Sequence, residues 1–149
     1  MSDTAVVLAA GSSSRMGAQK LLLDIGGRPM LAHALEACAH LPTVAVISEA
    51  VRPALAGYPA VRIVVNDAPE RGMAHSLRLA DAAIDPAEGL LVLLGDKPLV
   101  SQALVDTIRA ARDDADVCYP VAHGISGHPV AFSPKARALI AAVADGESL

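Results

Sequence analysis

A short apolar run near the N-terminus, residues 6–10 (VVLAA), stops abruptly at Gly11 and passes into three serines. A continuous apolar run of this length predicts a strand that is buried on both faces, as in a parallel sheet. A glycine at the end of such a strand lets the backbone approach a ligand, and exposed N–H groups beside fixed cations favour an anion. Arg15 and Lys20 supply the cations. The stretch therefore predicts a phosphate-binding loop at one edge of a sheet.

The spacing within this stretch excludes two common nucleotide loops. A Walker loop needs lysine directly after its second glycine, whereas Lys20 lies three residues beyond Gly17. The dinucleotide pattern G-x-G-x-x-G also fails, because Ser13 occupies the place of its second glycine. One alternative stays open from these residues alone, namely a flexible turn whose Arg15 and Lys20 face water.

The rest of the chain alternates between strand-like and helix-like patterns. Strands are expected at residues 6–10, 43–47, 61–65, 90–94, 117–121 and 130–132, and helices near residues 30–41, 50–56, 73–84, 104–111 and 134–143. Regular alternation of this kind predicts an α/β fold with right-handed crossovers and a single doubly wound, mostly parallel sheet. The glycine-rich stretch between the last two strands indicates a short antiparallel excursion near residues 117–132.

A carboxylate follows the apolar strand predicted at residues 90–94, in the sequence Gly95-Asp96-Lys97-Pro98. This strand and the first one would deliver their loops to the same carboxyl edge, where ligands of open α/β sheets gather. An oxygen of Asp96 could there hold Mg²⁺, which takes one or two protein carboxylates when phosphate oxygens supply the other ligands. The alternative is that Asp96 only forms the turn.

Three further polar positions have both a structural and a ligand-binding interpretation. Asn66 and Ser76 lie on either side of Gly72, where a helix is expected to begin. Their side chains could simply stabilise a turn or cap the helix. Glycine at position 72 would also leave room for a close ligand. His128 precedes Pro129, and packing beside the proline is the structural alternative to contact with a phosphate.

Four segments together resemble the signature of the MobA-like nucleotidyltransferases, which include the molybdenum cofactor cytidylyl- and guanylyltransferases. They are LAAGSSSRMG at residues 8–17 with Lys20, Asn66 with GMAHSL at residues 72–77, GDKP at residues 95–98 and GHPV at residues 127–130. The similarity extends over residues 4–134. The resemblance implies the Rossmann-like nucleotidyltransferase fold.

The resemblance also implies roles for individual residues. Arg15, Lys20 and Asp96 are expected to be catalytic, with Asp96 as the ligand of Mg²⁺, and His128 is expected near the acceptor. The expected nucleotide-binding residues are Leu8, Ala9, Ala10, Gly11, Ser12, Ser13, Arg15, Met16, Gly17, Lys20, Asn66, Gly72 and Ser76.

The implied activity is Mg²⁺-dependent transfer of a nucleoside monophosphate from a nucleoside triphosphate to a phosphate-bearing acceptor, with release of pyrophosphate. Ala9-Ala10-Gly11 is similar to the cytidylyltransferase version of the motif, which favours CTP. Molybdopterin, a sugar phosphate and another alcohol phosphate all remain open as acceptors. A non-catalytic nucleotide-binding or assembly-partner protein with the same fold is the alternative function.

Length and charge bound the remaining possibilities. A chain of 149 residues is expected to form one domain over residues 1–149, and its net charge of −4 without a basic stripe argues against a nucleic-acid partner. No apolar run approaches a membrane span and no charged leader precedes the first strand, so no membrane partner and a cytoplasmic location are expected. Cys38 and Cys118 lack C-x-x-C spacing, which predicts reduced thiols.

The C-terminal end departs from the family pattern. Relatives usually continue with a strand that carries a second acidic metal ligand and with a closing helix, and we expect both to be missing here. Asp145 or Glu147 could substitute for that ligand, although their spacing does not require it. A sheet edge left open in this way would favour a homo-oligomer.

Overall fold

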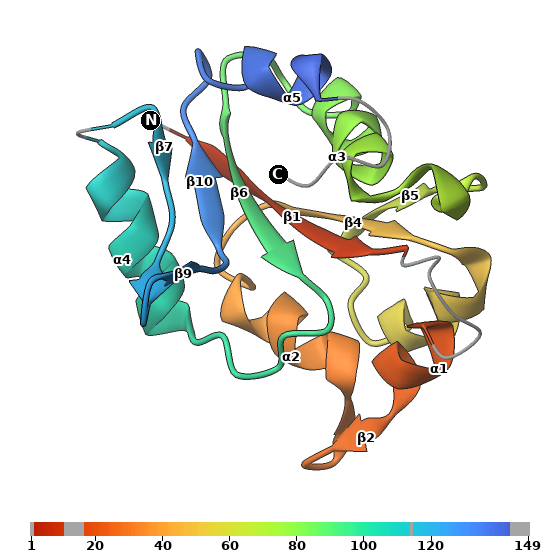
Figure 1. The fold of residues 1–149 in the computed structure, drawn as a ribbon. Coiled ribbons are helices and arrows are strands. Elements are labelled where there is room, and N and C mark those ends of the chain that lie inside the picture. The colour runs from red at the N-terminus through yellow and green to blue at the C-terminus, as the bar shows by residue number, and fades with distance from the viewer. Residues whose placement is uncertain (1, 11–16, 114, 144–149) are drawn as a thin grey trace.

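The computed structural model describes residues 2–10, 17–113 and 115–143, and its centre is a six-stranded sheet in the order β5-β4-β1-β6-β10-β7 (Figure 1). The sheet strands are β1 (Asp3–Ala9), β4 (Thr43–Ile47), β5 (Arg62–Val65), β6 (Gly89–Leu94), β7 (Val117–Cys118) and β10 (Val130–Phe132). Two small ribbons pair β2 (Asp24–Ile25) with β3 (Arg28–Pro29) and β8 (Val121–Ala122) with β9 (Ile125–Ser126). The helices are α1 (Gly17–Leu22), α2 (Met30–Ala37), α3 (Met73–Ala82), α4 (Gln102–Arg112) and α5 (Ala138–Ala142), with 3₁₀ turns η1 (Glu49–Leu55) and η2 (Pro69–Arg71). None of the helices among the described residues has the length and hydrophobicity of a membrane span.

Helices cover both faces of the sheet, and the alternation of side chains along β1 shows why. Ala5, Val7 and Ala9 point into a core formed with α2, η1 and α4. Val6 and Leu8 point into a second core formed with α3 and α5 on the other face. A strand buried on both sides needs apolar residues at successive positions, which explains the uninterrupted run in the sequence. The predicted doubly wound, mostly parallel sheet is confirmed.

The chain changes direction across the sheet at β1. From β1 it moves through α2 to β4 and then to β5, whereas α3 carries it back to β6 on the opposite side of β1. Both neighbours of β1 run parallel to it, and Leu8 lies in register with Leu94 near the end of β6. The carboxyl ends of β1 and β6 therefore meet at the switch point where open α/β sheets bind ligands.

The predicted antiparallel excursion is also confirmed, with one correction. β10 runs antiparallel to both β6 and β7, and the β8–β9 ribbon precedes it. The single strand predicted at residues 117–121 is wrong, because β7 ends at Cys118 and β8 begins at Val121. Pro120 lies between them and has no N–H for a ladder, while its carbonyl accepts a hydrogen bond of 2.9 Å from the backbone N of Gly127.

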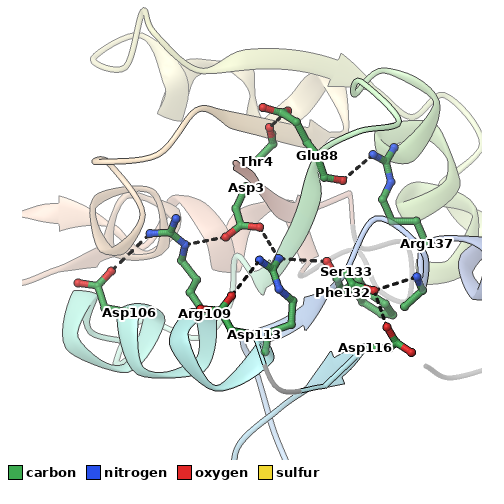
Figure 2. A network of polar contacts seen from close by, with 12 residues as sticks. Asp3, Thr4, Glu88, Asp106, Arg109, Asp113, Asp116, Phe132, Ser133 and Arg137 are labelled. Atoms are coloured by element: carbon green, nitrogen blue, oxygen red, sulfur yellow. Dashed lines mark hydrogen bonds and ion pairs between the residues drawn. The ribbon is translucent and has the colours of Figure 1, made fainter. Parts of the chain in front are cut away.

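A buried ionic network fixes the helices at the amino edge of the sheet (Figure 2). The carboxylate of Asp3 on β1 accepts hydrogen bonds from Arg112 and, at 2.9 Å, from Nε of Arg109, both on α4. Gly89 lies so close to this pair that a Cβ there would collide with Nη1 of Arg112. On the other face, Arg137 donates to Oδ1 of Asp81 at 2.6 Å. These contacts anchor α4 and the segment before α5, away from the carboxyl edge.

Candidate functional site

Gly95 brings the ends of β1 and β6 into direct contact. Its backbone N donates a hydrogen bond of 2.9 Å to the carbonyl of Leu8. A Cβ at this position would lie 2.9 Å from Cδ1 of Leu31 and 3.2 Å from the Leu8 carbonyl oxygen. Only glycine fits this gap without displacing its neighbours. The close approach sets the following residue, Asp96, at the end of β1.

Asp96 faces a lysine from a distant part of the chain. Nζ of Lys20, on α1, lies 3.6 Å from Oδ2 of Asp96, with side-chain exposures of 52% and 41%. An ion pair this exposed is screened by water and adds little to stability. Both groups are therefore accessible to a ligand at the carboxyl edge. The structure thus brings together two of the three residues predicted to be catalytic.

The predicted residues of β1 can meet a ligand only through their backbone. Leu8, Ala9 and Ala10 are each less than a tenth exposed, and their side chains pack into the two cores. Gly17 is the first residue of α1. The remaining predicted loop residues and the two C-terminal acidic candidates lie outside the described residues, namely Gly11, Ser12, Ser13, Arg15, Met16, Asp145 and Glu147.

Asn66 and Ser76 are bound to each other. The amide Nδ2 of Asn66 donates to Oγ of Ser76 at 2.8 Å, and its Oδ1 accepts from the backbone N of Ala68 at 2.8 Å. Both side chains are buried, with exposures of 2% and 4%. The pair fixes the loop after β5 to the first turn of α3. No pattern in the sequence signals this pairing, which spans the whole loop.

Gly72 ends that loop in a conformation that favours glycine. Its φ is 96° and its ψ is −179°, and α3 begins at the next residue, Met73. An L side chain rarely adopts this φ, so the backbone itself requires glycine here. The loop between Asn66 and α3 is therefore held at both ends, by a side-chain hydrogen bond and by a glycine turn.

His128 approaches the same edge from the antiparallel strand. Val130 of β10 lies opposite Val92 of β6, so the residues before β10 run alongside the end of β6. The Nε2 atom of His128 is buried and has no hydrogen-bond partner among the described residues. Burial lowers the pKa of this imidazole, the charge of Lys97 lowers it further, and the charge of Asp96 opposes the shift.

The described part of the site offers an oxygen ligand for a hard cation but no complete metal cage. Among the described residues, no group of three or more His, Cys, Asp or Glu side chains could hold an ion. Mg²⁺ is bound in proteins by one or two carboxylates, with water and phosphate oxygens completing its octahedron. The accessible Asp96 carboxylate fits that donor set when a polyphosphate is present. The neighbouring ammonium of Lys20 suits the same polyanion.

Comparison with known proteins identifies the domain. The family model described as the MobA-like NTP transferase domain matches residues 5–149. The chain belongs to this family. The resemblance inferred from the four sequence segments is thereby confirmed, and the nucleotidyltransferase fold agrees with it.

Curated relatives of the MobA-like domain are longer proteins. One named bifunctional protein GlmU from Alkalilimnicola ehrlichii is 42% identical over 119 residues, which are 74% of this chain and 25% of the relative. Another of the same name, from Roseobacter denitrificans, is 34% identical over 126 residues, with coverages of 78% and 28%. The chain thus spans about a quarter of the length of the curated relatives that it matches.

Solved structures share the fold over nearly all of the MobA-like domain. Rv0371c from Mycobacterium tuberculosis H37Rv superposes with a TM-score of 0.86 at 28% identity, covering 99% of this chain and 79% of that one. Its complex with manganese gives a TM-score of 0.82 at 26% identity, with coverages of 98% and 78%. A nucleotidyl transferase from Methanothermobacter, Mth528, gives 0.77 at 27% identity, with coverages of 98% and 78%.

Proposed function

We propose that this MobA-like domain moves a nucleoside monophosphate from a nucleoside triphosphate to a phosphate-bearing acceptor and releases pyrophosphate. The observation that carries the proposal is the 3.6 Å approach of Lys20 Nζ to Asp96 Oδ2 where β1 and β6 end. CTP is the favoured donor, because Ala9-Ala10-Gly11 is similar to the cytidylyltransferase motif. Molybdopterin is one candidate for the acceptor.

In this proposal an oxygen of the acceptor attacks the α-phosphorus of the nucleotide. As that bond forms, the bond from the α-phosphorus to the oxygen bridging to the β-phosphate breaks, and pyrophosphate leaves with the electron pair. Arg15 and Lys20 balance the negative charge that gathers on the leaving group. The reaction needs no covalent intermediate on the protein.

Asp96 would hold the divalent ion. When bound, Mg²⁺ would neutralise phosphate charge as a Lewis acid. The solved complex of Rv0371c with manganese supports a divalent ion in a related domain. The exposure of the Asp96 carboxylate leaves it free to exchange its contact with Lys20 for an ion.

The nucleotide would lie along the carboxyl ends of β1 and β5. The backbone of Leu8, Ala9 and Ala10 and the loop of residues 11–17 would surround its phosphates. Asn66, Gly72 and Ser76 would shape the wall beside the base, because their contacts fix the loop that opens α3. His128 would lie on the acceptor side, next to β6.

Pyrophosphate release tests the proposal. The protein is incubated with Mg²⁺, with CTP, GTP, UTP or ATP, and with a panel of phosphate-bearing acceptors, and pyrophosphate is measured by a coupled assay. We expect release that needs both substrates and is fastest with CTP. Thermal stabilisation by nucleotides without product from any acceptor would instead support the non-catalytic nucleotide-binding alternative.

A further inference from the structure

We propose that His33 is a positioning residue for Lys20, because its imidazole holds the β2–β3 ribbon against α2 and so fixes the end of α1. The proposal rests on the function proposed above for the role of Lys20. Within the described part of the chain, the side-chain hydrogen bonds of His33 go to Ile25 and Arg28, neither of which is a predicted site residue. His33 therefore acts through the segment between α1 and α2.

Two backbone hydrogen bonds connect Lys20 to α2. The backbone N of Leu23 donates to the carbonyl of Lys20 at 3.2 Å, and the backbone N of Met30 donates to the carbonyl of Leu23 at 2.8 Å. Met30 is the first residue of α2, and the β2–β3 ribbon lies between Leu23 and Met30. A shift of the ribbon therefore reaches Lys20 through Leu23.

The helix that carries Lys20 is too short to fix the position of this side chain by itself. α1 has only six residues, and isolated helices shorter than about 12 residues are marginal in water. Leu21 anchors one side of α1 in the core, whereas Lys20 is exposed. The place of the Lys20 ammonium thus depends on the segment that follows α1.

The β2–β3 ribbon gains little stability from its own contacts. β2 and β3 have two residues each, joined by a turn at Gly26 and Gly27, and a lone two-stranded hairpin is marginally stable at best in water. The side chains of Leu23 and Ile25 are exposed, so hydrophobic burial contributes little. Figure 1 shows the ribbon projecting from the molecule beyond α1 and α2. Contacts with α2 must therefore supply most of what keeps it in place.

His33 on α2 makes one such contact with each strand of the ribbon. Its Nε2 lies 2.6 Å from the carbonyl oxygen of Ile25 on β2, and its Nδ1 lies 3.3 Å from Nη2 of Arg28 on β3. A carbonyl oxygen only accepts hydrogen bonds and a guanidinium only donates them. The proton of the neutral ring therefore sits on Nε2, and both ring nitrogens have a partner.

Of these two contacts, the one with Ile25 acts directly on the backbone. Arg28 also pairs with Glu36, further along α2, but both side chains are exposed and such an ion pair adds little to stability. The hydrogen bond from Nε2 instead fixes a main-chain atom of the segment whose backbone bonds lead to Lys20. Removal of the Nε2 donor should thus loosen the ribbon and displace the Lys20 ammonium.

NMR of the full chain tests the contacts of His33 directly. At about pH 8, where imidazoles are ordinarily neutral, side-chain ¹⁵N spectra should show this ring as a single tautomer with the proton on Nε2. His33→Ala should speed the hydrogen exchange of the Leu23 and Met30 amides about fivefold, the effect of one lost hydrogen bond. His33→Gln, whose amide N can take the place of Nε2, should restore the slow exchange, whereas the shorter His33→Asn should not.

The same variants test the positioning of Lys20. The affinity for CTP with Mg²⁺, measured by calorimetry, should fall about fivefold in His33→Ala and His33→Asn and return in His33→Gln. All three variants should melt close to the wild type, because the lost contacts are exposed. His40→Ala is the matched control. Nε2 of His40 lies 2.8 Å from Oδ1 of Asp106 at the other end of α2, so this variant loses one histidine hydrogen bond and should match the wild type in both measurements.

Three NMR results would overturn the proposal, namely a His33 ring that interconverts between tautomers, unchanged exchange of the two amides in His33→Ala, or His33→Gln behaving like His33→Ala. Faster exchange in His33→Ala without a loss of CTP affinity would overturn it as well. A wild-type protein with the expected tautomer and exchange pattern that binds no nucleotide would instead contradict the proposed function.

Discussion

The ammonium of Lys20 lies 3.6 Å from the carboxylate of Asp96, which joins the helix after β1 to the turn after β6. These two segments are far apart in the chain and meet because β6 returns to the side of β1 opposite to β4. Since both side chains are half-exposed, their attraction contributes little to folding. Their placement therefore points to ligand binding rather than to stability.

Replacing either member of this pair should impair turnover and spare the fold. Lys20→Ala and Asp96→Ala should each lower the rate of pyrophosphate release by about 10²-fold or more, because a well-placed charge is removed from the reacting phosphates. The melting temperature should hardly change, since both groups are exposed. Lys135→Ala is the matched control for loss of a lysine. Near wild-type rates in both variants would remove the site assignment.

Gly95→Ala should disturb the contact between β1 and β6. The added Cβ would meet Cδ1 of Leu31 at 2.9 Å and the Leu8 carbonyl at 3.2 Å, so we expect a loss of stability of about 1–3 kcal/mol in a denaturant titration. Gly57→Ala is the matched control, because nothing lies within 4 Å of its Cβ position. Equal stability of the two variants would show that the end of β6 shifts freely.

Asp3→Ala should be strongly destabilising, because it removes the buried carboxylate that pairs with the buried guanidinium of Arg112. Removal of one member of a buried pair typically costs about 3–5 kcal/mol. Asp113→Ala is the comparison, since Asp113 lies 3.9 Å from the same arginine but is 69% exposed. We expect little change in its free energy of unfolding. A small effect of Asp3→Ala would mean that water reaches Arg112.

The buried thiol of Cys38 should lower the free energy of unfolding at alkaline pH. Burial raises the pKa of its thiol above the ordinary value of 9.0. The unfolded chain then loses this proton at a lower pH than the folded chain. The thiol's contribution to the free energy of unfolding is therefore fully present below about pH 9 and is lost as the pH rises through the pKa of the folded state. The free energy of unfolding should therefore fall less in Cys38→Ala than in the wild type between about pH 8 and pH 10. Cys118→Ala, which removes a half-buried thiol, should keep the wild-type fall.

Much of the fold can be predicted from the sequence, because buried parallel strands leave a direct pattern. The runs at residues 43–47 and 130–132 coincide with β4 and β10. Local interruptions are harder to place. The strand expected at residues 117–121 breaks at Pro120, and the helix expected from Pro134 begins only at Ala138. Pro120 has no backbone N–H for a ladder, which ends the strand, whereas residues 134–137 form hydrogen-bonded turns before α5 begins.

The sequence predicts which site residues follow the ends of the sheet strands. It does not predict which side chains of the site contact one another. The edge shared by Lys20 and Asp96 follows from the parallel order of β1 and β6. Packing in the folded chain determines two other features, namely the hydrogen bond between Asn66 and Ser76 and the burial of His128 Nε2 without a partner among the described residues. The spacing of residues in the sequence indicates neither of them.

Binding of CTP with Mg²⁺, followed by thermal unfolding, tests the central claim that the ends of β1 and β6 form one triphosphate site. At saturating ligand the wild type and Lys135→Ala should gain about 5 °C or more in melting temperature. Lys20→Ala and Asp96→Ala should lose most of that gain, because each removes a charge that holds the triphosphate. The same gain in all four proteins, or none in the wild type with any nucleotide, would contradict the account.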